Sequence, residues 1–127
     1  MRFIIPLPPV SKKNSQQILI NWQTGKPFIA PSKQFIDYEA AALWYIPRNV
    51  HIDFAVNVKC LFYMPTRRLC DLPNMLEAID DIMVKAGLLK DDNYKIVQSH
   101  DGSKILYDKE NPRTDICITK AETADNE

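Results

Sequence analysis

The sequence has 127 residues, of which 46% are hydrophobic and 25% charged, and its formal net charge is zero. This length and composition are typical of one globular domain that buries a core. They exclude a membrane-spanning protein, because no apolar run approaches the roughly 20 residues that such a helix needs.

The N-terminus and the cysteines indicate the compartment. Residues 1–13 are too short and too rich in proline for the apolar core of a signal peptide. Cys60, Cys70 and Cys117 are odd in number and lack paired C-x-x-C spacing, which argues against a disulfide framework or a zinc knuckle. We therefore expect a cytoplasmic protein.

Charge is divided unevenly along the chain. Residues 1–70 contain nine Lys or Arg and three Asp or Glu, whereas residues 71–127 contain seven and thirteen. The first part could face phosphate groups while carboxylates gather elsewhere. The alternative is an ordinary surface on which both signs are mixed.

The first third of the chain predicts a strand, a hairpin and a helix. Residues 2–7 indicate an edge strand, because Pro6 has no N–H to donate to a neighbour. Residues 18–22 and 27–30 flank Thr24-Gly25, a turn typical of a β-hairpin. Ser32 is a suitable N-cap for a helix that ends at about Tyr45, before Pro47. The expected buried face of this helix consists of Phe35, Tyr38, Ala42 and Tyr45.

A long strand and a second helix follow. Apolar residues alternate with mostly polar ones over residues 51–64, which is the clearest strand pattern in the chain. After a loop over residues 65–73, a helix is predicted from about Pro73 to Ala86, with Gly87 at its C-terminal end.

The remaining sequence predicts three short strands over residues 94–99, 104–107 and 115–119. Asp101-Gly102 indicates a hairpin turn between the first two. Residues 122–127 are polar and are expected to fray beyond a domain of residues 1–121. The mixed order of elements predicts a small single α+β domain with a mixed β-sheet and two main helices.

Acidic residues gather on and around the second helix. Glu77, Asp80 and Asp81 share one face and repel one another unless cations intervene, although a solvated face is the ordinary interpretation. The opposite, apolar face consists of Leu76, Ile79, Ile82, Met83 and Ala86. Asp71 precedes the helix and Asp91-Asp92 follow it, where an N-cap and a turn are the ordinary interpretations.

If these flanking carboxylates converge, their chemistry is specific. Mg²⁺ prefers carboxylate oxygens and keeps several waters, which leaves positions for a phosphate and an attacking water. Arg67, Arg68 and the Lys12-Lys13 loop would then hold neighbouring DNA phosphates. The spacing of Asp71 and Asp92 alone does not decide whether they converge.

Residues 64–93, MPTRRLCDLPNMLEAIDDIMVKAGLLKDDN, resemble the core signature of the RusA family of Holliday junction resolvases. That signature has an arginine-bearing loop, D-L-D-N, a helix with a central aspartate and K-A-G, and then D-D before a strand. The interval between Asp71 and Asp92 matches that of the family. The resemblance extends weakly to Leu7-Pro8-Pro9, Asn14 and residues 115–119.

The resemblance implies a homodimeric α+β nuclease of a kind typically encoded by phages or prophages. Such enzymes use Mg²⁺ (or Mn²⁺) and place one acidic site per subunit on opposing strands of a four-way junction, which they cut by paired nicks. Carried over by position, the catalytic carboxylates are Asp71 and Asp92, with Asp91 close by. The expected DNA-binding residues are Lys12, Lys13, Asn14, Arg67 and Arg68.

The chain departs from the family pattern at two positions. Pro73 replaces the second carboxylate of D-L-D-N, and Glu77 replaces the catalytic lysine one turn further on. Glu77 could supply the missing ligand, with Asp80 or Asp81 as alternatives. We therefore expect Asp71, Asp92 and Glu77 to be catalytic. The expected metal ligands are Asp71, Asp91, Asp92 and Glu77.

Two other functions remain open: a non-catalytic protein that binds DNA junctions, and a dimeric interaction module. His51 and His100 are interpreted as surface or capping residues. Trp22 and Trp44 are expected in the core or a dimer interface, with stacking on unpaired bases as the alternative. With only three glycines the chain has no glycine-rich phosphate loop, which excludes a P-loop and argues against a nucleotide cofactor.

Overall fold

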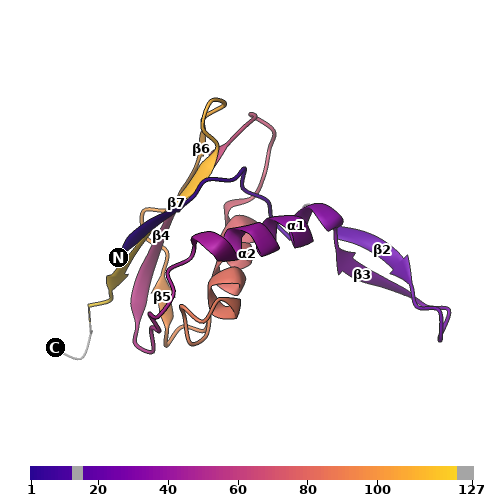
Figure 1. Cartoon of the computed structure of the whole chain (residues 1–127), viewed down its shortest axis with the longest axis horizontal. Helices are drawn as coiled ribbons and strands as arrows, with labels where there is room; N and C mark the ends of the chain where they lie inside the picture. Colours follow the sequence, from indigo (N-terminus) through magenta and orange to yellow (C-terminus); the bar gives the residue numbers. More distant parts are fainter. Residues whose placement is uncertain (13–15, 123–127) are drawn as a thin grey trace.

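A mixed β-sheet with two helices forms the body of the protein (Figure 1). The computed structural model describes residues 1–12 and 16–122, so the predictions for Lys13, Asn14 and residues 123–127 lie outside the described residues. The sheet has five strands in the order β1-β7-β4-β5, and β6 also pairs with β4. Helices α1 (Lys33–Ala42) and α2 (Leu72–Lys85) lie on one side of it. The predicted α+β fold is confirmed.

Strand β4 (Val56–Met64) lies at the centre of the sheet. Along one edge it pairs antiparallel with β7 (Arg113–Lys120), which in turn pairs with the edge strand β1 (Arg2–Ile5). Along its other edge, β5 (Val97–Ser99) and β6 (Lys104–Tyr107) both run parallel to it. The two short strands thus share one edge of β4, one after the other.

The core lies between the sheet and the helices. Val56, Val58, Cys60 and Phe62 alternate along β4 and are all buried, whereas the residues between them are half-buried or exposed. Large side chains from both helices, from β7 and from the segment after α2 complete this core. They include Phe35, Ile79, Ile82, Met83, Leu88, Leu89 and Ile116. Every second side chain of β4 is therefore buried, as the alternation of apolar and polar residues in the sequence predicts.

The predicted hairpin is present and forms a separate arm. β2 (Gln16–Ile20) and β3 (Pro27–Pro31) pair antiparallel as a two-stranded sheet that projects away from the body (Figure 1). The side chain of Asn21 accepts hydrogen bonds from the amides of Gln23 and Thr24 in the turn. Gly25 adopts a φ of 71°, a conformation that side chains disfavour.

The long strand begins later than its alternating pattern predicts, at Val56 rather than at residue 51. Ile52 instead forms an isolated parallel bridge with Leu89. The amide of Ile52 donates to the carbonyl of Leu88 at 2.7 Å, and the amide of Lys90 donates to the carbonyl of Ile52 at 2.9 Å. The segment before β4 is therefore bonded to the loop that follows α2.

The hairpin predicted at Asp101-Gly102 is wrong, although a turn is present. Gly102 has a φ of 88°, and the amide of Ser103 donates to the carbonyl of His100 at 3.1 Å. The flanking strands β5 and β6 do not pair with each other, because each pairs with β4. The strand expected from residue 94 begins only at Val97, since the amides of Ile96 and Val97 donate to the carbonyl of Asn93 in a turn. The last strand is longer than predicted and spans Arg113–Lys120.

The helices differ from prediction mainly at their ends. Ser32 caps α1 as expected, accepting a 3.2 Å hydrogen bond from the amide of Phe35. The α-helix ends at Ala42, and a 3₁₀ turn η2 (Leu43–Tyr45) leaves Tyr45 exposed rather than buried. Helix α2 begins at Leu72, with Pro73 in its first turn, where an N–H has no helical partner. None of the helices in residues 1–12 and 16–122 is long and apolar enough to cross a membrane.

Truncation of Phe62 tests the central position of β4. Phe62 is 1% exposed, and we expect Phe62→Ala to lower the free energy of unfolding by about 3–5 kcal/mol because it opens a cavity in the core. Phe54, which is 45% exposed just before β4, is the matched control, and Phe54→Ala should cost about 1 kcal/mol or less. Urea unfolding measures both. Equal losses would contradict this account of the core.

Candidate active site

Asp71 lies at the junction between the β4–α2 loop and the helix. It occupies the N-cap position with an extended backbone, yet its side chain makes no capping hydrogen bond. Instead, the side-chain amide of Asn74 donates to Asp71 Oδ2 at 3.3 Å, and the Asp71 residue is exposed. The N-cap interpretation is therefore right for the position of Asp71 but not for its carboxylate, which remains accessible.

The loop that carries Asp91 and Asp92 is held by its own side chains. Asp91 accepts hydrogen bonds from the amide of Asp92 at 2.7 Å and from the side-chain amide of Asn93 at 3.0 Å. Asn93 Oδ1 accepts from the amide of Lys95 at 3.0 Å. These are the contacts of a turn, and they occupy both carboxylate oxygens of Asp91.

Two of the predicted catalytic residues meet in a small hollow between this loop and α2. The hollow has a volume of about 110 Å³, and both Glu77 and Asp92 line it. Its other lining residues are Lys12, Asn74, Ala78 and Asp81. Asp71 and Asp91 do not line it, although Asp71 contacts the lining residue Asn74. We call this cavity the acidic hollow.

Lysines partly balance the charge of the acidic hollow. Asp81 Oδ2 lies 3.8 Å from Lys12 Nζ and 3.5 Å from Lys85 Nζ. Lys85 also contacts Glu39 of α1 at 3.1 Å, and its hydrogen bond to Glu39 raises the pKa of Lys85. Asp81 is therefore engaged with two ammonium groups, whereas Glu77 and Asp92 are the other carboxylates that line the hollow.

Electrostatic repulsion is evident at Asp92. Although much of the residue is exposed, desolvation of its carboxyl group raises the pKa of Asp92 above the ordinary 3.8. A hydrogen bond with Asp91 and the negative charges of Asp91 and Asp80 raise it further. A cation near Asp92 would relieve this repulsion, because an opposite charge favours the ionised form.

The buried Asp80 of α2 pairs with His100, which is half-buried. Asp80 is 5% exposed, so the predicted solvated face is wrong for this residue. His100 Nε2 donates to Asp80 Oδ2 at 2.6 Å. Burial raises the pKa of Asp80 despite the opposing effect of His100, and the hydrogen bond to Asp80 raises the pKa of His100. The sequence suggested that His100 is a surface or capping residue. The structure shows instead that it is bonded to a buried carboxylate.

No sequence signal pointed to the pairing of Asp80 with His100. The two residues are 20 positions apart, and His100 has no neighbouring motif. It comes directly after β5, whose parallel pairing with β4 sets the position of the following turn beside α2. A helical projection places Asp80 with Glu77, but it cannot reveal that another segment covers one of them.

The donor set of the acidic hollow suits a hard cation held by few protein ligands. In residues 1–12 and 16–122, no three His, Cys, Asp or Glu side chains are grouped closely enough to hold a metal by themselves. Mg²⁺ commonly takes only one or two carboxylates and completes its shell with water and substrate phosphate. Glu77 and Asp92 together meet that lesser requirement, whereas Asp81 Oδ2 already lies close to the ammonium groups of Lys12 and Lys85.

The predicted DNA-binding residues have different environments. Lys12 lines the acidic hollow. The guanidinium of Arg67 lies over the ring of Tyr107 at 4.2 Å, which restricts its orientation. Arg68 lines a second, larger hollow on the other side of the N-terminal segment. Lys13 and Asn14 lie outside the described residues.

Comparison with known proteins gives one informative relative. No family model matches the chain. The sequence is 35% identical over 105 residues to the crossover junction endodeoxyribonuclease RusA of Aquifex aeolicus (strain VF5), which covers 80% of this chain and 79% of that protein. The chain belongs to the RusA family. The resemblance seen in residues 64–93 is thereby confirmed.

Within this RusA-family fold, the two halves of the signature lie on opposite sides of the acidic hollow. The D-L-P-N segment begins α2, and its Asn74 lines the hollow one turn before Ala78. The D-D segment contributes Asp92 from the loop beyond α2. Pro73 is exposed in the first helical turn, and Glu77 lines the hollow.

The pair of Asp80 and His100 predicts the titration of His100. Because its folded pKa is raised above the ordinary 6.5, its contribution to stability is complete below about pH 6.5 and is lost as pH rises through the folded pKa. In an NMR titration, His100 should therefore titrate above 6.5, and Asp80→Asn should lower its midpoint. The chain has two histidines, so His100→Gln identifies the signal. An unchanged midpoint in Asp80→Asn would contradict the assigned contact.

Proposed function

We propose that this chain is a structure-selective endodeoxyribonuclease that resolves four-way (Holliday) DNA junctions by paired, metal-dependent hydrolysis of phosphodiester bonds. The observation that carries the proposal is the meeting of Glu77 and Asp92 in one hollow, 15 residues apart in sequence and on different elements. The named activity of the relative from Aquifex aeolicus, a crossover junction endodeoxyribonuclease, supports the choice of substrate.

Glu77 and Asp92 would hold Mg²⁺ or Mn²⁺ together with a phosphate oxygen of the DNA. When bound, the ion supplies a water of lowered pKa and neutralises charge on the phosphate. In the hydrolysis, the water oxygen forms a bond to phosphorus, one ester P–O bond breaks, and the leaving oxygen takes up a proton. Asp71 remains a proposed ligand because its exposed carboxylate contacts Asn74 at the edge of the hollow, and Asp91 holds the loop of Asp92.

Cationic residues beside the hollow would position the DNA. Lys12 lines the acidic hollow itself, Arg68 lies on the β4–α2 loop, and Arg67 is oriented by Tyr107. Lys13 and Asn14 belong to the same proposal through the family pattern. Phosphate contacts of this kind fix the register of the duplex arms without reading their sequence.

A non-catalytic junction-binding protein is the second candidate. Two observations favour it: Pro73 provides no side-chain oxygen where the family pattern has a carboxylate, and the described residues contain no three-ligand cluster. A protein of this kind would bind four-way junctions with strong salt dependence but would not cut them. A dimeric interaction module would neither bind nor cut them.

Cleavage of a labelled four-way junction distinguishes these functions. In Mg²⁺ or Mn²⁺, we expect paired nicks in the junction and none in linear duplex. Asp92→Asn and Glu77→Ala should each reduce the cleavage rate by about a hundredfold or more, because each removes a carboxylate from the acidic hollow. Asp37→Asn, an exposed position on α1, is the matched control and should cut at the wild-type rate.

The outcomes separate the candidates clearly. Tight junction binding without cleavage in either metal would leave the binding protein. Cleavage that persists in Glu77→Ala but not in Asp92→Asn would reject Glu77 as the replacement ligand. Absence of both binding and cleavage would favour the interaction module.

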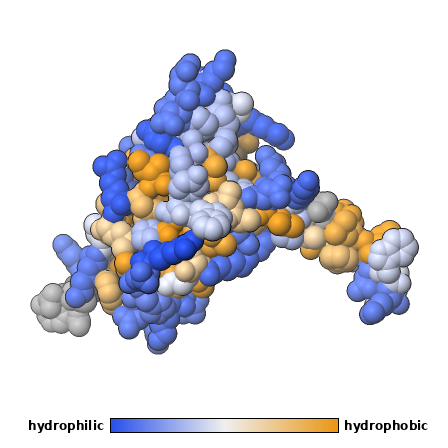
Figure 2. Space-filling model, in the orientation of Figure 1, coloured by the Kyte–Doolittle hydropathy of each residue, from blue (hydrophilic) through white to orange (hydrophobic). Residues whose placement is uncertain are grey.

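The homodimer needed for paired cuts has a candidate interface in the β2–β3 arm. Ile18, Ile20, Trp22 and Ile29 are each more than 60% exposed, and Figure 2 shows the apolar surface that they give the arm. Lys26 is the only charged residue between positions 16 and 31, so the arm is poorly suited to DNA phosphates. A two-stranded ribbon needs a covering partner for stability. A second copy offers the same apolar patch across a twofold axis.

Loss of the apolar patch should therefore dissociate the dimer. Ile18 and Ile29 are cross-strand partners in the arm, and the double variant Ile18→Ser, Ile29→Ser should raise the dimer dissociation constant about tenfold or more. Ile36→Ser is the control, because Ile36 is 54% exposed on α1, outside the two strands of the arm. Sedimentation velocity measures the assembly. A monomeric wild type, or an equally dimeric double variant, would reject the arm as the interface.

A further inference from the structure

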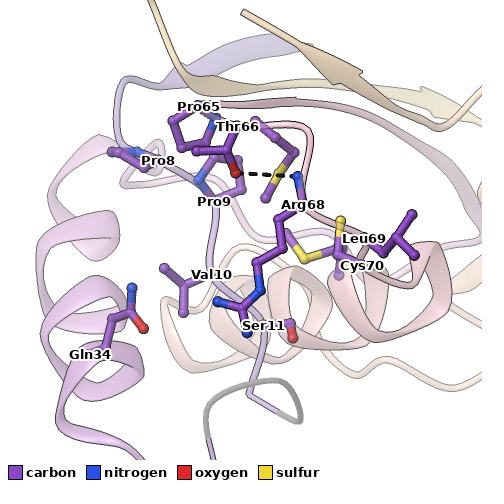
Figure 3. A pocket seen from close by; sticks show the side chains of 12 residues that line it. Pro8, Pro9, Val10, Ser11, Gln34, Pro65, Thr66, Arg68, Leu69 and Cys70 are labelled. Atoms are coloured by element: carbon purple, nitrogen blue, oxygen red, sulfur yellow. Dashed lines mark hydrogen bonds between the residues drawn. The ribbon is translucent and has the colours of Figure 1, made fainter. Parts of the chain in front are cut away.

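The larger hollow of the protein lies beside the acidic one and has no role so far. It has a volume of about 340 Å³ and is enclosed by the N-terminal segment, α1, the β4–α2 loop and the start of α2 (Figure 3). Pro8, Pro9 and Val10 form one wall, and Met64 and Met75 contribute to the rest. These flat or flexible apolar groups provide a surface against which a planar ring can pack.

Polar groups enter the same hollow from two sides. Gln34 lines it from the exposed side of α1, and its amide carries both donor and acceptor atoms. The side chain of Arg68 reaches from the loop across the hollow toward Ser11, as Figure 3 shows. No carboxylate pairs with the guanidinium of Arg68 in the described part of the chain. Arg68 is therefore a cation without a counter-charge at the mouth of an apolar hollow.

The two hollows share a wall. Ser11 lines the larger hollow and Lys12, the next residue, lines the acidic one. On α2, Met75 belongs to the larger hollow and its neighbour Asn74 to the acidic one. A DNA strand with one phosphodiester at the acidic hollow would therefore bring an adjacent nucleotide to the larger hollow.

We propose that the larger hollow is a subsite for a single unstacked base of the junction, beside the phosphodiester that is cut. This inference rests on the proposed nuclease function. Arg68 binds the phosphate of that nucleotide, the prolines, Val10 and Met64 pack against the face of the base, and Gln34 hydrogen-bonds to its edge. The proposal makes Gln34 and Arg68 determinants of substrate choice rather than of the chemical step.

The chemistry of the hollow favours a base over other DNA groups. A phosphate alone would use Arg68 but not the apolar walls, and a duplex arm keeps its bases stacked and out of reach. Extruding a base costs least where stacking and pairing are already weakened. The crossover of a four-way junction interrupts stacking, so the subsite would help to distinguish a junction from linear DNA.

Filling the hollow tests the proposal without any cleavage. Junctions are prepared with a single abasic position near the crossover, and their dissociation constants are measured by fluorescence anisotropy without divalent metal. Gln34→Trp fills the hollow, and Lys33→Trp places the same side chain on the adjacent exposed position of α1, outside the lining. Thermal unfolding verifies that both variants fold.

At one abasic position we expect wild type and Lys33→Trp to show the same ratio of abasic to intact dissociation constants. In Gln34→Trp that ratio should be smaller by about fivefold or more, because the base no longer has a site to occupy. A missing base also changes the junction DNA itself, but all three proteins are measured on the same DNA, so this effect cancels when their ratios are compared. Equal ratios at every position, with junction binding retained, would overturn the subsite alone. Wild-type protein that binds junction no better than duplex would overturn the proposed function as well.

Discussion

The parallel edge of β4 determines the geometry of the candidate site. Parallel neighbours require a connection that crosses over the sheet, and α2 provides that connection between β4 and β5. The end of β4 leads to Asp71 at the start of α2, and the return to β5 carries the loop of Asp92 back along the helix. One crossover thus brings the D-L-P-N and D-D segments to opposite sides of a single hollow. Ile52, bonded to Leu88 and Lys90, secures the return.

Two sets of contacts offset the negative charge of the carboxylates on α2, one at the surface and one in the interior. At the surface, Lys12 and Lys85 lie close to Asp81, and Asp92 retains unfavourable interactions with Asp91 and Asp80. Below it, Asp80 is buried and bonded to His100, because an isolated buried carboxylate would be costly. This arrangement fixes the orientation of α2 while leaving Glu77 and Asp92 as lining residues of a cavity of about 110 Å³. The hydrogen bond between Asp80 and His100 therefore supports the acidic site above it on α2.

The two residues that differ from the expected signature, Pro73 and Glu77, lie close together in the structure. Pro73 and Glu77 both belong to the first turns of α2, next to the acidic hollow. Proline suits the first helical turn, because an N–H at that position has no helical partner. Glu77 contributes a carboxylate to the hollow from one turn further along. Helix α2 thus presents an acidic residue, Glu77, to the same hollow as Asp92.

The sequence by itself determined the elements whose signals are local. Ser32 and Pro47 bounded the first helix closely, and Thr24-Gly25 located the hairpin of the arm. The alternation over residues 51–64 identified the central strand, although the strand itself begins at Val56. The signature over residues 64–93 identified the RusA family, because its spacing reflects a whole strand–loop–helix–loop unit. These features depend on backbone conformation and on residues close in sequence, which is why they can be recognised without a structure.

Only the tertiary structure decided how separate segments meet. It placed β5 and β6 on one edge of β4 where Asp101-Gly102 suggested a hairpin, and it diverted Ile52 to Leu89. It buried Asp80 beneath His100 and joined Glu77 with Asp92, while Asp71 stayed outside the same lining. A helical projection gives the direction of a side chain but not what covers it. Coverage depends on contacts between distant segments, and those are set by the packing of the whole sheet against α2.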